Sequence, residues 1–248
     1  MICNLAAYQF VRIDAIDTLL MRLREHCAQA GLLGTILVAE EGINCFLAGA
    51  RSAIDSFVDW IHSDPRFADM PIKLSDSDTV PFRRLRIKRK AEIISFRRAG
   101  IHPERGRAAS VSAQELFQWL QVGRDAEGRE ICLLDTRNEE EVAHGTFEGA
   151  LSLPIRCFTQ LPDALEQHRE AMAGKTIVSF CTGGIRCEKS AIWMQEAGFE
   201  NVLQLDGGIL GYFEQVGGFG YRDRCFVFDD RVALDPQLRP LVQMASEP

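Results

Sequence analysis

The sequence of 248 residues has no long apolar segment. Its longest apolar runs, such as residues 36–39 and 131–134, are of strand length, whereas a membrane-spanning helix requires about 20 such residues. The N-terminus lacks the basic stretch and the sustained apolar stretch that together form a secretory signal. These absences predict a protein that is neither membrane-embedded nor secreted, and no membrane partner is expected.

Patterns for metal ligands and disulfides are also missing. The eight cysteines form no C-x-x-C pair, and the five histidines form no H-x-x-x-H pair, so no metal is expected. The cysteines are scattered and stand mostly in apolar segments, which is typical of reduced core thiols rather than of a disulfide framework. Reduced thiols predict a cytoplasmic protein. No cofactor motif is evident, and nothing indicates an obligate protein partner.

Charge is distributed unevenly along the chain. The net charge is −7, yet residues 83–107 hold ten of the 28 basic residues against two acidic ones. This segment has a net charge of +8 and leaves −15 for the rest of the chain. Such a concentration of positive charge indicates an anionic partner; the alternative is a solvated surface strand. The candidate residues for binding this partner are Arg83, Arg84, Arg86, Lys88, Arg89, Lys90, Arg97 and Arg98.

The first third of the chain has the pattern of a ferredoxin-like sandwich. Residues 5–13, 32–39, 43–47 and 72–74 read as strands, and apolar residues at helical spacing predict helices near 16–27 and 54–61. The order βαββαβ is that of a split-βαβ fold. Residues 85–96 alternate basic with apolar residues and are expected to be extended. We place this domain at residues 1–98.

Strands and helices alternate strictly in the second half. Residues 99–110 contain glycine, proline and charge without a period, which predicts a linker, and Ser110 or Ser112 can cap the following helix. Strands are expected at 131–135, 150–153, 176–180 and 202–205, with helices between and after them, including one over 161–172. Alternation of this kind indicates a parallel sheet covered on both faces. We place this domain at residues 111–217 and a C-terminal tail at 218–248.

The stretch FCTGGIRCEKS, residues 180–190, follows a buried strand and precedes a helix. Ligands bind outside the carboxyl ends of the strands in parallel sheets, and Cys181 stands at one such end. Gly183 and Gly184 allow the backbone amides to turn inward, and the helix N-terminus and Arg186 add positive charge. These features lower a thiol pKa. We therefore predict a nucleophilic thiolate at Cys181, rather than a buried core cysteine beside a helix-capping glycine pair.

The spacing within this loop separates two enzyme classes. Cysteine-dependent phosphatases use C-x5-R, which wraps a phosphoryl group, whereas four residues separate Cys181 from Arg186 here. The tighter loop suits a sulfur atom. The active-site loop is expected to comprise Thr182, Gly183, Gly184, Ile185, Arg186 and Cys187.

Cys187 and Lys189 follow in the adjoining helix. Cys187 could resolve an oxidised Cys181 by disulfide exchange, or it could simply pack inward. Lys189 and Arg186 are candidates for orienting a phosphate.

Two further stretches resemble the rhodanese domain. Residues 133–138 (LLDTRN), with Glu141, look like its Asp-x-Arg strand end, and 145–150 (GTFEGA) look like its G-H-I-x-G-A turn, with Thr146 in place of the usual histidine. In physical terms, Asp135, Arg137 and Glu141 are expected to brace the site through ion pairs and hydrogen bonds rather than to perform chemistry.

The similarity extends from about residue 5 to residue 235. Together with CTGGIRCEKS (181–190), LDGGILGYFE (205–214), GTILVAEEGIN (34–44) and PFRRLRIKRKAEII (81–94), the chain resembles the TrhO-type tRNA uridine hydroxylase family. That resemblance implies an acylphosphatase-like (ferredoxin-like) α+β sandwich followed by a rhodanese-like α/β domain. Longer members continue into a cysteine-rich C-terminal region, so this chain is expected to be a short form.

The resemblance also implies a function. Members convert the wobble uridine, position 34, of certain tRNAs to 5-hydroxyuridine with molecular oxygen as co-substrate. Cys181 is implied as the essential thiol, and the anticodon region of tRNA as the partner. The resemblance thus makes the eight basic residues named between Arg83 and Arg98 candidates for RNA binding. Two alternatives remain at this point. The loop alone predicts a sulfurtransferase that passes persulfide sulfur to an acceptor, and the basic segment also suits a noncatalytic RNA-binding adaptor.

Overall fold

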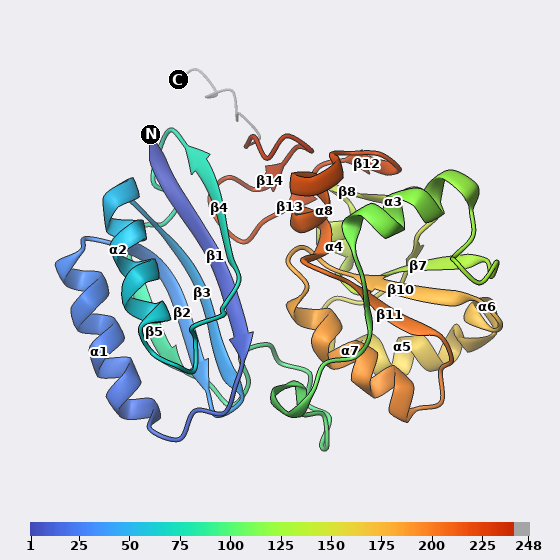
Figure 1. Ribbon diagram of the computed structural model, residues 1–248, viewed down its shortest axis with the longest axis horizontal. Helices are drawn as coiled ribbons and strands as arrows, with labels where there is room; N and C mark the ends of the chain where they lie inside the picture. Colours follow the sequence, from blue (N-terminus) through green and yellow to red (C-terminus); the bar gives the residue numbers. More distant parts are fainter. Residues whose placement is uncertain (241–248) are drawn as a thin grey trace. The chain divides into compact units, whose positions relative to one another are not determined.

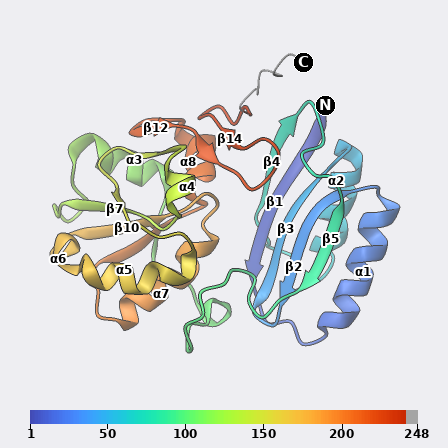
Figure 2. The same cartoon turned by 180° about the vertical axis from the view of Figure 1, so that it is seen from behind.

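A computed structural model describes residues 1–240 as two compact units, drawn in Figure 1 and, from behind, in Figure 2. The first unit comprises Met1–Ser95 with His102–Arg105, and the second comprises Phe96–Ile101 and the chain from Gly106 onward. The expected boundary at residue 98 and linker at 99–110 therefore differ in detail from the division observed. Part of the expected tail, residues 241–248, lies outside the described residues. Within residues 1–240, no helix is long and apolar enough to cross a membrane.

The first unit is a five-stranded sheet with two helices on one face (Figure 1). The strand order is β4-β1-β3-β2-β5, in which the first four strands are antiparallel neighbours and β5 runs parallel to β2. This arrangement confirms the ferredoxin-like prediction and adds β5 as a fifth strand at one edge. The elements are β1 (Ile2–Phe10), α1 (Ile16–Gln29), β2 (Leu33–Ala39), β3 (Gly42–Gly49), α2 (Arg51–His62), β4 (Ile72–Ser77) and β5 (Leu85–Arg89).

The apolar stripes of α1 and α2 build the core of this unit. The residues of α1 that were expected on one face by their helical spacing are all buried: Ile16, Leu19, Leu20, Leu23 and Cys27. The turn between β2 and β3 depends on a close backbone approach, because a Cβ at Gly42 would lie 2.1 Å from the carbonyl oxygen of Gln9. The side chain of Glu41 accepts a hydrogen bond from the Ile93 amide at 2.7 Å. Glu41 therefore anchors the chain that follows β5.

The second unit is a parallel sheet in the order β6-β11-β10-β7-β9. Helices α3 and α8 cover one face, and α5 and α7 cover the other (Figures 1 and 2), which confirms the predicted α/β layering. The main elements are β6 (Ser110–Val111), α3 (Ala113–Val122), β7 (Ile131–Asp135), α4 (Glu139–Val142), β9 (Leu151–Ser152), α5 (Leu161–Gln167), α6 (Arg169–Met172), β10 (Thr176–Phe180), α7 (Ile185–Glu196), β11 (Val202–Leu205) and α8 (Gly208–Val216).

Local signals explain where these elements begin and end. Ser112 caps α3 by accepting a hydrogen bond from the Glu115 amide, while the Glu115 side chain accepts one from the Ser112 amide. The single helix expected over 161–172 was wrong, because the chain leaves helical geometry at His168 (φ −112°, ψ 11°), which separates α5 from α6. The extended segment expected over 85–96 forms a strand only as far as Arg89.

The chain after α8 is built into this unit by strand pairing. Strand β12 (Tyr221–Asp223) pairs with β8 (Gly145–Phe147), and β13 (Cys225–Phe226) pairs with β14 (Ala233–Leu234). The ring of Phe147 lies edge-on to those of Phe180 and Tyr221 at 5.0 and 5.1 Å. Residues that the sequence analysis treated as a tail therefore pack against the end of the sheet that carries Cys181.

Candidate active site

Cys181 directly follows β10, the central strand of the parallel sheet. The chain then turns through Gly184, which has a left-handed φ of +100°, and α7 begins at Ile185. The amide of Gly184 donates a hydrogen bond to the Cys181 sulfur at 3.2 Å. The Cys181 thiol therefore stands at the carboxyl end of the central strand, with a backbone amide as a donor to its sulfur.

Gly208, at the start of α8, holds the other side of this loop. The amides of Ile209 and Leu210 donate to the carbonyl oxygens of Cys181 and Thr182 at 2.9 and 3.0 Å. A Cβ at Gly208 would lie 2.5 Å from the Cys181 carbonyl oxygen. This glycine belongs to the stretch LDGGILGYFE, in which no local pattern indicates its role. The close packing of α8 on the loop shows why glycine is required here.

Cys181 is 1% exposed, but polar groups surround its sulfur. Burial raises the pKa of the Cys181 thiol; a hydrogen bond from Cys187, the charge of Arg186 and the amides of Arg186 and Gly184 outweigh it and lower the pKa to about 6. The buried sulfur is therefore held as a thiolate at neutral pH.

Cys187 is the protonated partner of this pair. Burial and the neighbouring Cys181 sulfur raise the pKa of the Cys187 thiol. The hydroxyl of Thr136 donates a hydrogen bond to the Phe180 carbonyl oxygen at 2.9 Å. The same hydroxyl oxygen lies 3.8 Å from the Cys187 sulfur. Cys187 thus donates its thiol hydrogen and the Cys181 sulfur accepts it. The sequence analysis considered Cys187 as a resolving thiol or as a packing residue, but not as a hydrogen-bond donor.

Arg186 is held by Glu141. Its two terminal nitrogens donate to the two carboxylate oxygens at 2.9 and 2.7 Å, and both side chains are buried. The sequence analysis did not anticipate this pairing with Glu141, and a role of Arg186 in orienting a phosphate stays a prediction. Arg186 stabilises the Cys181 thiolate through its charge, while Glu141 fixes where that charge stands.

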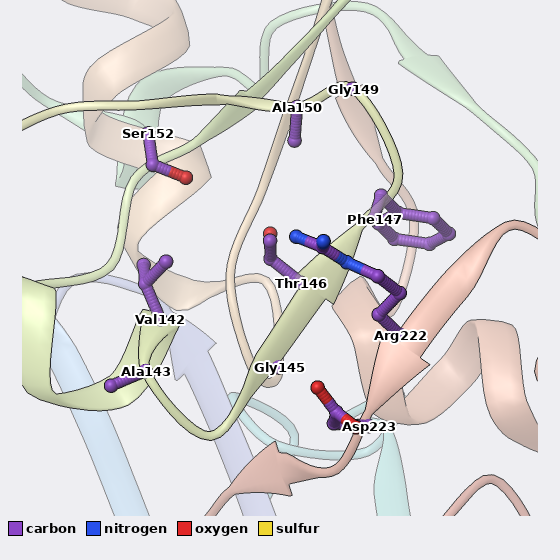
Figure 3. A pocket seen from close by; sticks show the side chains of 10 residues that line it. All are labelled: Val142, Ala143, Gly145, Thr146, Phe147, Gly149, Ala150, Ser152, Arg222 and Asp223. Carbon is purple, nitrogen blue, oxygen red and sulfur yellow. The ribbon is translucent and has the colours of Figure 1, made fainter.

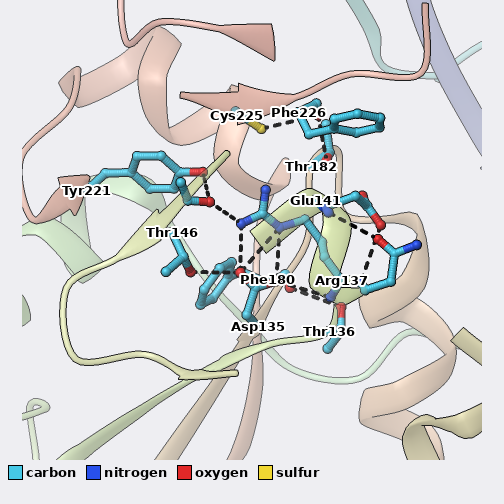
Figure 4. Close-up of polar contacts among 12 residues, drawn as sticks. Asp135, Thr136, Arg137, Glu141, Thr146, Phe180, Thr182, Tyr221, Cys225 and Phe226 are labelled. Carbon is cyan, nitrogen blue, oxygen red and sulfur yellow. Dashed lines mark hydrogen bonds and ion pairs between the residues drawn. The ribbon is translucent and has the colours of Figure 1, made fainter. Parts of the chain in front are cut away.

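A second buried ion pair lies beside the loop (Figure 4). Arg137 donates to Asp135 at 2.9 and 2.7 Å and to the Gly145 carbonyl oxygen at 2.7 Å, and neither charged side chain is exposed. Asp135 also accepts the hydroxyl of Thr146 at 2.7 Å. Tyr221 donates to the same Gly145 carbonyl at 2.8 Å. Asp135 and Arg137 thus brace the end of β7 against the β8–β12 ribbon, and Tyr221 is a member that sequence reasoning missed.

The segment after β12 also reaches the loop. The hydroxyl of Thr182 donates to the Phe226 carbonyl oxygen at 3.2 Å, and the Phe228 ring centroid lies 5.6 Å from the Arg186 guanidinium carbon. Burial raises the pKa of the Cys225 thiol to about 11, so this cysteine stays neutral. No local motif in the sequence marked these residues as neighbours of Cys181.

The remaining predicted site residues have varied positions. Lys189 is buried, at 2% exposed, and its role toward a phosphate stays a prediction. Space is open around Gly183, where a Cβ would meet nothing within 4 Å. Across residues 1–240, no group of three His, Cys, Asp or Glu side chains is placed to hold a metal ion.

A separate cavity of about 500 Å³ opens beside β8 (Figure 3). Mostly small side chains line it, together with Phe147, Asp223 and Arg222, and Arg222 extends across Thr146. Thr146 also donates a hydrogen bond to Asp135. This cavity therefore borders the Asp135–Arg137 ion pair, and Cys181 is not among the residues that line it.

The structure divides the predicted RNA-binding residues between the two units. Arg83 to Lys90 belong to the first unit, whereas Arg97 and Arg98 belong to the second, where Arg98 pairs with Asp163 at 2.6 Å. Arg89 lies 3.6 Å from Asp17 and 3.9 Å from Glu40. The eight residues therefore have different surroundings, and Arg89 and Arg98 lie beside carboxylates.

Four cations meet at the edge strand β5. A cleft of about 480 Å³ is lined by Arg24 of α1 and by Arg84, Arg86, Lys88 and the apolar residues between them, with no acidic residue among them. Arg24 donates to the Ile87 carbonyl oxygen at 3.3 Å. We refer to this feature as the β5 cleft. The sequence analysis did not include Arg24, because it precedes Arg84 by 60 residues in the chain.

The lowered pKa of Cys181 leads to a direct prediction. The rate at which iodoacetamide alkylates Cys181 should rise with pH through a midpoint near 6, because the thiolate is the reacting form, and level off above it. The measurement is mass spectrometry of the peptide that contains Cys181. In urea-unfolded protein the same peptide should show a midpoint of about 8.5. Equal midpoints in the two states would contradict the prediction.

Comparison with known proteins now adds to this geometry. A family described as "UPF0176 acylphosphatase like domain" matches residues 2–93, and one described as "Rhodanese-like domain" matches residues 112–215. A Xanthomonas euvesicatoria protein named tRNA uridine(34) hydroxylase is 61% identical over 98% of both chains. A Xylella fastidiosa protein of the same name is 56% identical over 98% of this chain and 95% of its own. Among solved structures, the rhodanese-like domain of an Anabaena protein is 20% identical over 47% of this chain and 80% of its own, with a TM-score of 0.38.

Proposed function

The chain belongs to the tRNA uridine(34) hydroxylase family, and from this premise we propose that it hydroxylates uridine 34 of tRNA, with Cys181 as the reacting thiol. The observation that supports this role is the thiolate itself: a buried sulfur with an amide donor at 3.2 Å and a pKa lowered to about 6. A structural cysteine in a core would keep its proton. We place the reaction in the cytoplasm.

A thiolate can activate the uracil ring for oxidation. Its sulfur forms a bond to C6, and the electron pair of the C5–C6 double bond makes C5 nucleophilic. C5 then bonds to an oxygen atom, loss of the C5 proton follows, and expulsion of the sulfur restores the double bond. We take molecular oxygen as the oxidant. One of its atoms ends on C5 and the other leaves as water, so the reaction also consumes two electrons and two protons from a reductant such as a low-molecular-weight thiol.

The test is direct. Purified protein, tRNA, a thiol reductant and ¹⁸O₂ should give 5-hydroxyuridine at position 34 that is heavier by one ¹⁸O atom, as detected by nucleoside mass spectrometry. Product that carries only oxygen from water would refute the role of molecular oxygen. Absence of product under these conditions would count against the hydroxylase assignment itself.

We further propose that the β5 cleft binds the phosphate backbone of the tRNA near its anticodon region. The cleft combines four cations with no lining carboxylate, and β5 ends its sheet, so the outer edge of the strand is not covered by another strand within residues 1–240. Cations that replace counterions on RNA phosphates provide affinity that falls with salt. Arginine side chains suit this task because their planar donors match phosphate oxygens.

This leads to a prediction about salt dependence. The double variant Arg86→Ala/Lys88→Ala should bind tRNA about tenfold more weakly near physiological salt, and the slope of log affinity against log salt should fall by about 2, since each phosphate contact contributes about one unit. Filter binding at several KCl concentrations measures both quantities. Arg12→Ala/Arg51→Ala is the matched control, because those exposed cations pair with Asp14 and Asp55 at 2.8 Å. Equal slopes for the two double variants would exclude the cleft.

A sulfurtransferase remains the second candidate, because a thiolate held by main-chain amides can also carry a persulfide. Thiosulfate and cyanide separate the two functions. Rapid turnover of both, together with unchanged 5-hydroxyuridine in cells that lack the gene, would favour sulfur transfer. A noncatalytic RNA-binding adaptor would retain its cellular role after Cys181 is replaced by serine.

A further inference from the structure

Phe228 is an exposed aromatic side chain beside the active-site loop. Its side chain is 56% exposed. Within residues 1–240, Phe219 is the one other phenylalanine, tyrosine or tryptophan that is exposed, at 45%. Single exposed apolar side chains are common on folded proteins and by themselves indicate no partner. What distinguishes Phe228 is its position beside the Cys181 loop.

The turn between β13 and β14 holds this ring in place. The ring of Phe226 lies edge-on to that of Phe228 at 5.1 Å, and the Val227 amide donates to the Val232 carbonyl oxygen at 2.9 Å. Val232 itself has a φ of +62°, which a β-branched residue rarely adopts. An ion pair between Asp229 and Arg231 at 2.6 Å closes the turn. Phe228 is thus presented by an organised turn, not by a loose chain.

The same turn is attached to the site of chemistry. Thr182, next to Cys181, donates its hydroxyl to the Phe226 carbonyl oxygen at 3.2 Å. The guanidinium carbon of Arg186 lies 5.6 Å from the centroid of the Phe228 ring, and Arg186 is the cation that stabilises the Cys181 thiolate. The exposed ring and the reacting sulfur are therefore coupled through one short, hydrogen-bonded segment.

A base that is to react must leave its stack, and an aromatic side chain can replace the lost contact. Proteins that recognise single-stranded RNA stack unpaired bases on phenylalanine or tyrosine rings. Uracil is flat and uncharged, so its face is compatible with a phenyl ring. Because Cys181 is buried, the uracil must be held so that C6 presents a ring face to the sulfur, and a fixed platform restricts the base to such an orientation.

We infer that Phe228 is the stacking platform for the nucleobase that Cys181 attacks. The inference rests on the proposed function, and it identifies a residue that positions the substrate without taking part in bond making. Phe226 supports the platform through its edge-on contact. Because stacking does not discriminate strongly among bases, this platform contributes to the placement of position 34 rather than to the choice of uridine.

Kinetics on full-length protein with intact tRNA test the inference. Phe228→Ala should lower kcat/KM for 5-hydroxyuridine formation about tenfold, within the range of five- to 150-fold that loss of one stacked base produces. Phe228→Trp should retain activity within about twofold, because indole also stacks. The matched control is Phe219→Ala, which removes the other exposed ring; that ring packs on Phe117 at 5.0 Å and has no contact with the loop in the described interactions. Its activity should stay within about twofold of the wild type.

A second readout separates stacking from support of the loop. In Phe228→Ala the alkylation midpoint of Cys181 should remain near 6, because the amide donors and the Glu141–Arg186 pair are still present. Equal kcat/KM for Phe228→Ala and Phe219→Ala would overturn the inference, as would a shifted midpoint that accounts for the lost activity. Failure of the proposed function is distinct from these outcomes, because it would show as an inactive wild type.

Discussion

Replacing Cys181 with serine should reduce the formation of 5-hydroxyuridine at least about a thousandfold, because removal of a catalytic nucleophile typically costs that much or more. Serine keeps the size of the side chain, but its hydroxyl is not ionised near neutral pH, whereas the pKa of Cys181 is lowered to about 6. The measurement is nucleoside mass spectrometry of tRNA from cells that lack the gene and carry either the wild type or the variant.

Two other cysteines serve as controls for this experiment. Cys157 is exposed, so Cys157→Ser should restore the modification fully and show that loss of an arbitrary thiol is harmless. Cys187→Ser keeps a hydrogen-bond donor beside the Cys181 sulfur and should retain most of the activity. Restoration of 5-hydroxyuridine by Cys181→Ser would remove the thiol from the mechanism and leave the adaptor function as the better account.

Replacing Arg137 with methionine should lower the free energy of unfolding of the second unit by about 3–5 kcal/mol, the cost of leaving one member of a buried ion pair without its partner. Arg137 and Asp135 are both fully buried, and Arg137 also donates to the Gly145 carbonyl oxygen. Urea unfolding followed by the fluorescence of Trp119 and Trp193, in a Trp60→Phe background, reports on this unit.

The double variant Asp135→Asn/Arg137→Met is the control for charge. It removes both charges, so no buried charge is left uncompensated, and it should lose less stability than the single variant. A single variant within about 1 kcal/mol of the wild type would show that the pair does not brace the sheet end, since surface substitutions commonly have effects of that size or smaller.

Much of the fold could be predicted because its determinants are local. The stripe from Ile16 to Cys27 follows the helical period, and the buried β-branched run before Cys181 has the length of a strand. The glycines of the loop were recognised because a chain that turns its amides inward needs them. Each of these signals lies within about ten residues of sequence, which is the range over which periodicity and turn chemistry act.

The partners of the site residues could not be predicted in the same way. Arg186 was expected near the sulfur, but its partner Glu141 is 45 residues away, and only the fold brings their charges together. Tyr221 and Phe228 belong to a segment without periodicity, so the sequence analysis placed them only in a C-terminal tail. The basic run from Arg83 to Arg98 is continuous in sequence, yet the chain enters a different unit at Phe96.

The sequence by itself therefore determined the two-part architecture, the place of Cys181 at a strand end and the presence of positive charge around it, because these depend on composition, period and short spacing. Tertiary structure decided which charge faces which carboxylate, which cations share the β5 cleft and which aromatic ring stands beside the loop. Those choices depend on contacts between residues that are far apart in the chain. Burial makes the charged partners depend on each other, because a buried charge without a partner is costly.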